Sequence, residues 1–348
     1  MTWGKLLLNW YSDHAREFPW RNTTDPYRIW LSEIILQQTR TQQGLPYYQK
    51  FVERFPTVEH LADADEEEVL KLWQGLGYYS RARNLHFTAQ TIRDRYDGKF
   101  PQNFEELLQL KGVGDYTASA IGSICFGLRQ AVVDGNVYRV LSRYFGDSFP
   151  IDHHKALAHF KKIAQKLMED LDPAGFNQAM MEFGALHCTP KKPLCQSCPF
   201  QHNCVAYQTQ QIHLFPRKEK KTKIRKRYFH YLVIDNTSTK TYLQARQKKD
   251  IWQGLYEFPL LEKNTASLPS VSEWGSVLSP LGLPLHQLSK KPVRVVQHLL
   301  SHQKLLIHFW ILSLDKEAIP VEELSTPKDC PLPVPLLNFV EEYFYTAQ

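Results

Sequence analysis

The chain has 348 residues, a length that predicts roughly two domains, each large enough to bury its own core. Hydrophobic residues make up 43% and charged residues 22%, which excludes wholesale disorder, collagen and a simple coiled coil. The apolar stretches are shorter than the ~20 residues that cross a bilayer. The first residues lack the apolar core of a secretion signal and the Arg-rich, acid-poor pattern of a transit peptide. We therefore expect a cytoplasmic protein without a membrane span.

Helical spacing of apolar residues dominates residues 1–212, which are predicted to form an all-α domain. An early helix, residues 29–39, carries Glu33 among apolar neighbours. An unpaired buried carboxylate is costly. The sequence alone leaves three interpretations of Glu33 open: a functional acid, one half of an interhelical salt bridge, or a residue that faces solvent.

Residues 107–125 contain a tight glycine turn between two predicted helices. Gly112, Val113 and Gly114 end an apolar helix, and small residues begin the next one. Glycines in such a turn leave backbone N–H groups pointing outward, and together with the helix dipole they form a phosphate-binding nest. This arrangement resembles the helix-hairpin-helix of DNA repair glycosylases.

Two further features follow the hairpin. Asp134 lies among apolar residues in the segment VVDGNV, a pattern that by itself is most often a turn. Four cysteines crowd together at spacings of six, two and five residues: Cys188, Cys195, Cys198 and Cys204. Structural zinc normally uses two short knuckles, whereas this spacing favours a [4Fe-4S] cluster. A zinc site and chance clustering are the alternatives.

The order of hairpin, aspartate and four-cysteine loop resembles the endonuclease III superfamily. The resemblance implies that Asp134 is the catalytic carboxylate, which stabilises positive charge on deoxyribose. Lyase members carry a lysine two residues after the second hairpin glycine, and its amine forms a Schiff base. This chain has Tyr116 there. The resemblance therefore predicts simple hydrolysis, with a bifunctional glycosylase/lyase as the alternative.

Residues 19–21, 29–40 and 75–84 resemble the adenine DNA glycosylase branch of that superfamily, the MutY type. In that branch Glu33 would protonate adenine at N7, as a general acid whose burial raises its pKa. Tyr116 and Asn136 would orient Asp134 and the sugar. The resemblance assigns substrate contacts to Arg21, Leu36, Gln38, Thr39, Leu76, Tyr78 and Gln178.

The composition changes near residue 212. Residues 217–227 hold eight Lys/Arg and one Glu, and segment 213–227 is predicted to be a basic linker that also attracts phosphate. Strand-like runs at 228–234, 241–245, 293–299 and 305–314, with helices near 271–280 and 335–345, predict an α+β domain over residues 228–348.

Residues 250–259, DIWQGLYEFP, resemble Nudix (MutT-like) proteins, but the residues that follow lack the paired glutamates that hold magnesium. The resemblance implies a domain that recognises 8-oxoguanine opposite the target adenine. Ser301 and His302 lie between two predicted strands, at a hairpin tip suited to contact a base edge.

Together these features predict a multidomain protein: an all-α helix-hairpin-helix glycosylase domain with an iron-sulfur cluster loop, followed by an α+β Nudix-like domain. The resemblance implies a monomeric, monofunctional enzyme that removes adenine from A:8-oxoguanine or A:G mispairs in double-stranded DNA. Its expected location is the cytoplasm of a bacterial type of cell, near the nucleoid. A catalytically silent DNA-damage-binding protein is the alternative from a different functional class.

Overall fold

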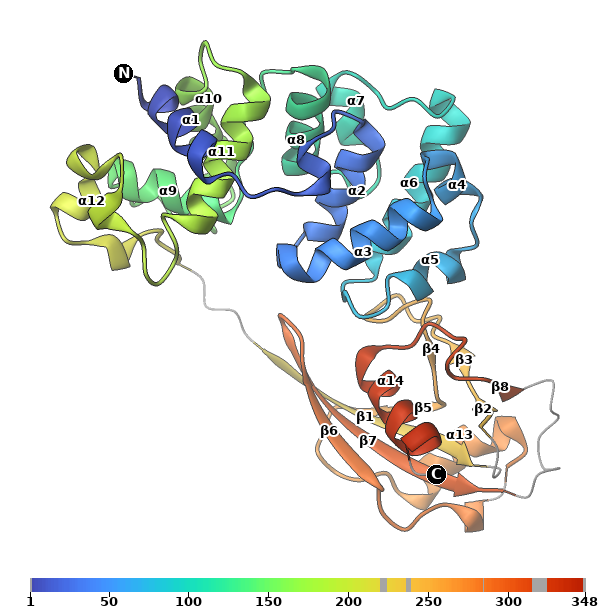
Figure 1. Cartoon of the computed structure of the whole chain (residues 1–348). Coiled ribbons are helices and arrows are strands. Elements are labelled where there is room, and N and C mark those ends of the chain that lie inside the picture. Colours follow the sequence, from blue (N-terminus) through green and yellow to red (C-terminus); the bar gives the residue numbers. More distant parts are fainter. Residues whose placement is uncertain (1, 220–223, 236–238, 284, 315–323, 347–348) are drawn as a thin grey trace. The chain divides into compact units, whose positions relative to one another are not determined.

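The computed structural model describes residues 2–219, 224–235, 239–283, 285–314 and 324–346 (Figure 1). The chain forms two compact units, residues 1–63 with 84–221 and residues 64–83 with 222–348. The predicted division at residue 212 keeps segment 64–83 in the first domain, whereas in the structure this segment belongs to the second unit. Residues 220–223 of the predicted basic linker lie outside the described residues. Over the described part of the chain, no helix has both the length and the apolar composition that a membrane span needs.

The first unit is all-α, as the helical spacing predicts. Its elements are α1 (Trp3–His14), η1 (Pro19–Arg21), α2 (Pro26–Leu36), α3 (Thr41–Arg54), α4 (Val58–Asp63), α7 (Phe104–Gln109), α8 (Asp115–Phe126), α9 (Gly135–Phe145), α10 (Ala156–Leu167), α11 (Pro173–Leu186), η2 (Cys195–Ser197), η3 (Gln201–Asn203), α12 (Val205–Gln208) and η4 (Ile212–Leu214). Helix α6 (Ser80–Tyr96) begins in the second unit and ends in the first.

Local capping chemistry determines where the functional helices begin. Asp25 accepts a hydrogen bond from the Tyr27 N–H at 2.9 Å and is followed by Pro26, so α2 begins there. Asp172 and Pro173 begin α11 in the same way, with a 2.6 Å bond from the Gly175 N–H. Helix α11 then packs against α1, α8 and α9, while α2 packs between α3 and α8. These contacts bring α2, α8, α9 and α11 around one site.

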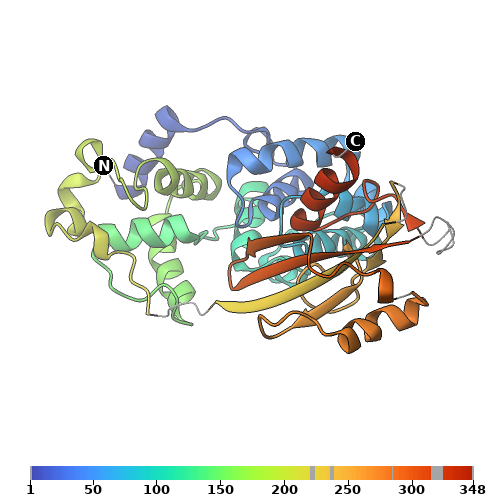
Figure 2. The same cartoon turned by 90° about the horizontal axis from the view of Figure 1, so that it is seen from below.

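The second unit contains a four-stranded mixed sheet in the order β5-β1-β7-β6. Strands β1 (Arg225–Asp235) and β7 (Gln303–Ser313) run parallel, side by side in Figure 2. At the edges, β5 (Leu260–Lys263) pairs antiparallel with β1, and β6 (Arg294–Leu299) pairs antiparallel with β7. Two small sheets pair β2 (Thr241–Tyr242) with β8 (Leu324–Ser325) and β3 (Gln244–Ala245) with β4 (Tyr256–Glu257). The remaining elements are α5 (Glu66–Leu72), α13 (Val271–Leu278), η5 (Ser279–Leu281), η6 (Leu285–Gln287), α14 (Val334–Val340) and η8 (Glu341–Thr346).

Helices cover both faces of the central sheet. Adjacent residues of a strand point to opposite faces. Phe309 of β7 therefore stacks on Phe339 of α14 at 3.9 Å, while Trp310 meets Trp274 of α13 at 5.5 Å on the other face. The predicted α+β architecture is confirmed. Strands β4 and β5 follow the 250–255 loop and were not predicted from the sequence.

Candidate active site

A cavity of about 210 Å³ lies within the first unit. This volume is below the ~300–1,000 Å³ of sites for drug-sized ligands, so it suits a small ring system. Residues of α2, α8, α11, the start of α9 and the segment before α2 line it. The lining residues are Arg16, Phe18, Trp20, Arg21, Ile29, Glu33, Leu36, Thr39, Thr41, Tyr116, Ile124, Asp134, Asn136, Gln178, Met181, Glu182 and Ala185.

Glu33 lies in the middle of α2 and is 8% exposed. Burial raises the pKa of its carboxyl to about 7; a hydrogen bond with Tyr116 lowers the pKa, Asp134 raises it, and Arg21 lowers it. Near neutral pH a large share of the carboxyl is therefore protonated. Of the three interpretations that the sequence leaves open, solvent exposure is wrong, because the side chain faces the cavity.

Asp134 is the N-cap of α9, which explains an aspartate directly before glycine at this position. One carboxylate oxygen accepts hydrogen bonds from the Asn136 and Val137 N–H groups at 2.9 and 2.8 Å, and the other accepts one from Asn136 Nδ2 at 2.7 Å. Burial raises the pKa of Asp134 above its usual value, and these three bonds limit the rise. The helix N-terminus thus supplies donors and a favourable dipole for a buried anion.

Asn136 is held in turn by a second set of contacts. Arg139 Nη2 donates to Asn136 Oδ1 at 2.8 Å and to the Gly184 carbonyl at 2.7 Å, so the Asn136 amide points its Nδ2 at Asp134. A Cβ at Gly184 would lie 2.5 Å from the Cβ of Asn136 and 3.1 Å from its Cα. Only glycine allows α11 to approach the start of α9 this closely.

Tyr116 lies in α8 between the two carboxyl groups. Burial raises its pKa well above the usual value, and the nearby charges of Glu33 and Asp134 raise it further. The side chain therefore stays a neutral phenol, whose hydroxyl hydrogen-bonds with Glu33 and lies 3.4 Å from Met181 Sδ. No lysine is among the residues that line the cavity.

Glu182 of α11 was not predicted as a site residue, yet it organises one wall of the cavity. Its carboxylate is 2% exposed and accepts two bonds from Arg21, at 3.0 and 2.7 Å, and three from Arg16, at 2.7 to 3.0 Å. Its partners lie more than 160 residues away in the sequence, so no local pattern points to it.

Most substrate residues expected in the first unit do gather in the cavity. Arg21, Leu36, Thr39 and Gln178 line it, and Gln178 Oε1 accepts a 3.2 Å bond from Tyr11. Gln38 does not line it. Instead Gln38 follows α2 as an exposed residue with φ of 56°, a left-handed conformation that turns the chain toward α3.

The predicted hairpin forms between α7 and α8. Gly112 has φ of 81°, and a Cβ there would lie 2.9 Å from that of Asn84, so glycine is required. Val113 is buried beneath the turn, and an added Cβ at Gly114 would meet no atom within 4 Å, which leaves room for a phosphate near the first N–H groups of α8.

The four clustered cysteines lie in the loop from Cys188 to Cys204, and all six cysteines of the chain are free thiols. Among the described residues no group of three or more His, Cys, Asp or Glu side chains is arranged to hold a single metal ion. The thiols are close enough to influence one another: burial, together with the neighbouring cysteines, raises the pKa of Cys198 to about 12. Arg143 approaches Cys188 Sγ at 3.4 Å and donates to the carbonyl of Thr189 at 2.7 Å. A set of four thiols beside a guanidinium suits an anionic cluster whose ligands bind separate irons.

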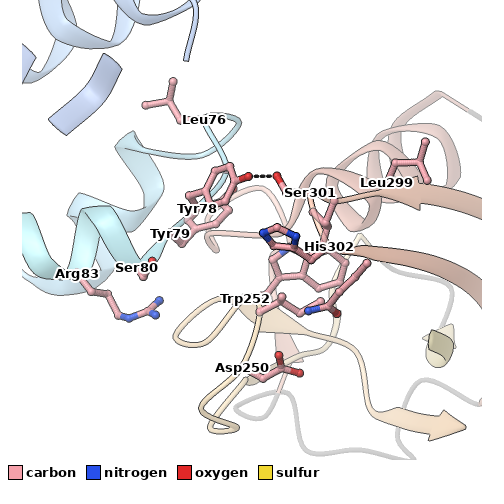
Figure 3. A pocket seen from close by; sticks show the side chains of 14 residues that line it. Leu76, Tyr78, Tyr79, Ser80, Arg83, Asp250, Trp252, Leu299, Ser301 and His302 are labelled. Atoms are coloured by element: carbon pink, nitrogen blue, oxygen red, sulfur yellow. Dashed lines mark hydrogen bonds between the residues drawn. The ribbon is translucent and has the colours of Figure 1, made fainter. Parts of the chain in front are cut away.

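A second cavity, of about 420 Å³, lies within the second unit (Figure 3). Leu76, Tyr78, Ser301 and His302 line it, and the hydroxyl groups of Tyr78 and Ser301 form a hydrogen bond. Ser301 and His302 lie at the turn between β6 and β7, as the sequence predicts.

Trp252 also lines this second cavity and was not predicted. It has φ of 62°, which is rare for a tryptophan, and its ring lies 6.0 Å from that of His298. Arg246 donates to the carbonyl of Ile251 at 2.9 Å and to both oxygens of buried Glu257, which holds the loop in this conformation.

Fold and site together define a helix-hairpin-helix DNA glycosylase with an iron-sulfur loop and an appended mixed-sheet domain. The protein-family matches agree. Residues 31–166 match the HhH-GPD superfamily base excision DNA repair protein, residues 188–204 the iron-sulfur binding domain of endonuclease III, and residues 230–342 the NUDIX domain.

Individual relatives narrow the assignment. The chain is 32% identical to the adenine DNA glycosylase of Buchnera aphidicola subsp. Baizongia pistaciae (strain Bp), over 97% of this chain and 95% of that protein. It is 33% identical to the adenine DNA glycosylase of Mus musculus, over 89% of this chain and 70% of that protein. A solved thermostable thymine-DNA glycosylase superposes with a TM-score of 0.55 at 31% identity, over 59% of this chain and 95% of that chain. The chain belongs to the adenine DNA glycosylase family. It is a base excision DNA repair enzyme that acts on DNA and carries a [4Fe-4S] cluster.

Proposed function

We propose that this protein is a monomeric, monofunctional glycosylase that hydrolyses the bond between adenine and deoxyribose where adenine is mispaired with 8-oxoguanine or guanine in duplex DNA. The observation that carries the proposal is the pair of buried carboxyl groups in one cavity, Glu33 in mid-helix and Asp134 at a helix N-cap. Two carboxyls in different environments divide acid and charge-stabilising roles, as in glycoside hydrolysis.

In the proposed reaction, adenine enters the cavity after it leaves the base stack. Protonated Glu33 gives its proton to adenine N7. The bond between N9 and C1′ then breaks, and its electron pair moves onto the adenine ring. The Asp134 carboxylate stabilises the positive charge left on deoxyribose. Water attacks C1′ and returns a proton to the Glu33 carboxylate, so the acid is regenerated.

Other residues of the cavity support these steps. Asn136 and Tyr116 hold the two carboxyl groups in place, through the contacts described above. Arg21 and Gln178 contribute polar groups to the wall on which the base would lie, and Leu36 contributes apolar surface. Because the cavity is lined without a lysine, the residues present give no amine for a Schiff base, which supports hydrolysis over the lyase alternative.

The hairpin and the cysteine loop hold DNA and the cluster in this proposal. The N–H groups near Gly112, Val113 and Gly114 contact a backbone phosphate and carry no sequence information. Cys188, Cys195, Cys198 and Cys204 are the proposed cluster ligands, since they are four free thiols in one loop. When bound, the cluster cross-links this loop.

The second unit is proposed to read the base opposite adenine. 8-Oxoguanine has an N7 proton and a C8 oxygen that guanine lacks, and a serine hydroxyl both donates and accepts. Ser301 is therefore the proposed contact, with His302, Leu76 and Tyr78 beside it in the same cavity. Tyr78 and Gln38 are each proposed to enter the duplex where a base is extruded.

The test is a single-turnover reaction on a duplex with one A:8-oxoguanine pair, analysed for free adenine and for strand breaks with and without alkali. Release of adenine with strand breaks only after alkali supports the proposal. Breaks without alkali would establish the lyase alternative, and tight binding without adenine release would establish a damage-binding protein. Light scattering of the free protein would test the monomer.

A further inference from the structure

The carboxylate of Glu182 is more heavily hydrogen-bonded than either proposed catalytic carboxyl. Its five bonds come from the two guanidinium groups and from the main-chain N–H of Arg16. Burial would raise the pKa of Glu182, but the bonds from Arg16 and Arg21 outweigh burial and lower it to about 2. Glu182 is therefore ionised at every pH at which the protein would work.

Glu182 also fixes the geometry of the segment before α2. Besides its bonds to Glu182, Arg21 Nη1 donates to the Arg16 carbonyl at 2.6 Å, so the chain closes into a loop around the carboxylate. Phe18, within this loop, stacks on Trp20 at 5.0 Å, and the guanidinium groups of both arginines lie 5.1 Å from its ring. Without Glu182 this loop would lose the anchor that holds it against α11.

The charges of the cavity balance only if Glu182 is counted. With Glu33 protonated, the guanidinium groups of Arg16 and Arg21 are matched by the carboxylates of Glu182 and Asp134. If Glu182 were neutral, one uncompensated positive charge would face the acid. A positive charge favours the ionised form of a carboxyl group and also opposes positive charge on the sugar.

We propose that Glu182 is a positioning residue of the active site: it holds Arg21 in the cavity wall and cancels the guanidinium charge next to Glu33, so that Glu33 stays a proton donor. This inference rests on the proposed function for its consequence in catalysis, but its structural content concerns the protonation of Glu33 alone. The inference goes beyond Glu33 and Asp134, because it assigns to Glu182 the role of keeping Glu33 protonated.

The ionisable groups around Glu33 come from every element packed near it. Tyr116 and Cys125 belong to α8, Asp134 begins α9, and Arg21 belongs to η1. Helix α3 contributes Thr41 to the cavity and no ionisable residue. Arg21 is the cation in this set that acts on Glu33, so it is the group through which a change at Glu182 would reach the acid.

The test compares Glu182→Gln with wild type by isotope-edited NMR of labelled glutamate, following the Glu33 carboxyl carbon against pH in protein without DNA. Neighbouring charges typically change a pKa by ~1–3 units at ~4–6 Å. Arg21 acts more weakly on Glu33 than burial, Tyr116 or Asp134 does, so we expect the pKa of Glu33 to decrease by about one unit. Glu182→Gln with Arg21→Met should return the titration to the wild-type pH, since the unpaired charge is then gone. A folded Glu182→Gln protein in which Glu33 titrates as in wild type would overturn the proposal.

Two further variants separate charge from structure. Glu257→Gln removes another buried carboxylate bound to an arginine, in the second unit, and should leave the Glu33 titration unchanged. Glu182→Asp keeps the charge with a shorter side chain, so Glu33 should titrate as in wild type even though base release slows. If Glu182→Gln does not fold, the test relies on Glu182→Asp. A decrease of about one unit in the pKa of Glu33 in that variant would refute the electrostatic role of Glu182. Failure of the proposed function would show separately, as wild-type protein that releases no adenine.

Discussion

Replacing Asp134 by asparagine separates its proposed chemistry from its role in the fold. Asp134 caps α9 through one oxygen that accepts from two backbone N–H groups. Asparagine is also a good N-cap and keeps an oxygen for the two backbone N–H groups, so the cap survives the substitution, while the negative charge and the bond from Asn136 Nδ2 are lost. The variant should therefore fold, bind DNA and fail to release adenine.

The sizes of the two effects differ enough to be measured separately. Loss of the favourable charge at the helix N-terminus costs ~0.3–1 kcal/mol of stability, and relief from burying a carboxylate offsets part of it. In the reaction, a unit charge about 4 Å from the developing positive charge contributes about 4 kcal/mol at an effective dielectric constant of ~20. Its loss slows the chemical step by about 10³-fold.

Single-turnover adenine release, duplex affinity and thermal unfolding would be measured on the same preparations. Asp172→Asn is the control for loss of charge at an N-cap, because Asp172 caps α11 through one bond from the Gly175 N–H and does not line the cavity. It should leave the rate of adenine release unchanged. If Asp134→Asn retains the wild-type rate, or loses affinity in parallel with rate, then Asp134 is a structural cap and the mechanism proposed above is incorrect.

Three further predictions follow from the sites. Glu33→Gln should slow base removal by ~10²- to 10⁴-fold, the range for a lost general acid. The pKa of Glu33 is raised from 4.5 to about 7 in the folded protein, so its protonated carboxyl stabilises the fold below pH 4.5, and this stabilisation is lost as the pH rises to about 7. Between pH 4 and pH 8 the free energy of unfolding of the Gln variant should therefore rise by about 3 kcal/mol relative to wild type, as measured by denaturation. A difference that does not depend on pH would contradict the raised pKa. Metal analysis should find about four irons per chain with broad visible absorbance, and Cys198→Ser should lose that absorbance, whereas stoichiometric zinc in wild type would refute the ligand assignment. Ser301→Ala with His302→Ala should reduce the preference for A:8-oxoguanine over A:G by about tenfold, the effect of losing one hydrogen bond, while adenine release continues. An unchanged ratio of single-turnover rates on the two duplexes would show that other residues recognise the lesion.

Local signals were sufficient for much of the site. The Gly112 turn and the cysteine loop are each defined by residues within about one helical turn or one loop, so local spacing was enough to predict them. The same holds for the turn that carries Ser301, since two strands with a short connection form a hairpin. Asp134 was assigned through the family resemblance, and its role as a helix cap was not predicted. Local sequence was not enough to assign Glu33, because the role of a carboxyl on an apolar helix is ambiguous until its neighbours in the fold are known.

The residues that the sequence did not reveal depend on contacts between distant segments. Glu182 acquires its role from arginines more than 160 residues away, and Gly184 acquires its role from the approach of α11 to Asn136. Trp252 is an exception, because the left-handed conformation that its residue type disfavours accompanies contacts of Arg246, a residue nearby in the sequence. Segment 64–83 belongs with the second unit because its partners, such as the Cys330 carbonyl that Lys71 contacts at 3.0 Å, come from the other end of the chain.

The position of each residue in its helix decides how many hydrogen bonds oppose the rise in pKa that burial causes at Glu33 and at Asp134. Glu33 lies in mid-helix, where backbone N–H groups are already bonded within the helix and none is free to stabilise an anion. Asp134 lies at the end of a helix, where the first N–H groups lack such partners and bond to its carboxylate instead. Both side chains are buried in the same cavity, so burial alone does not distinguish them. Because the middle of α2 has no free N–H group to offer an anion, Glu33 keeps the proton that the proposed mechanism requires.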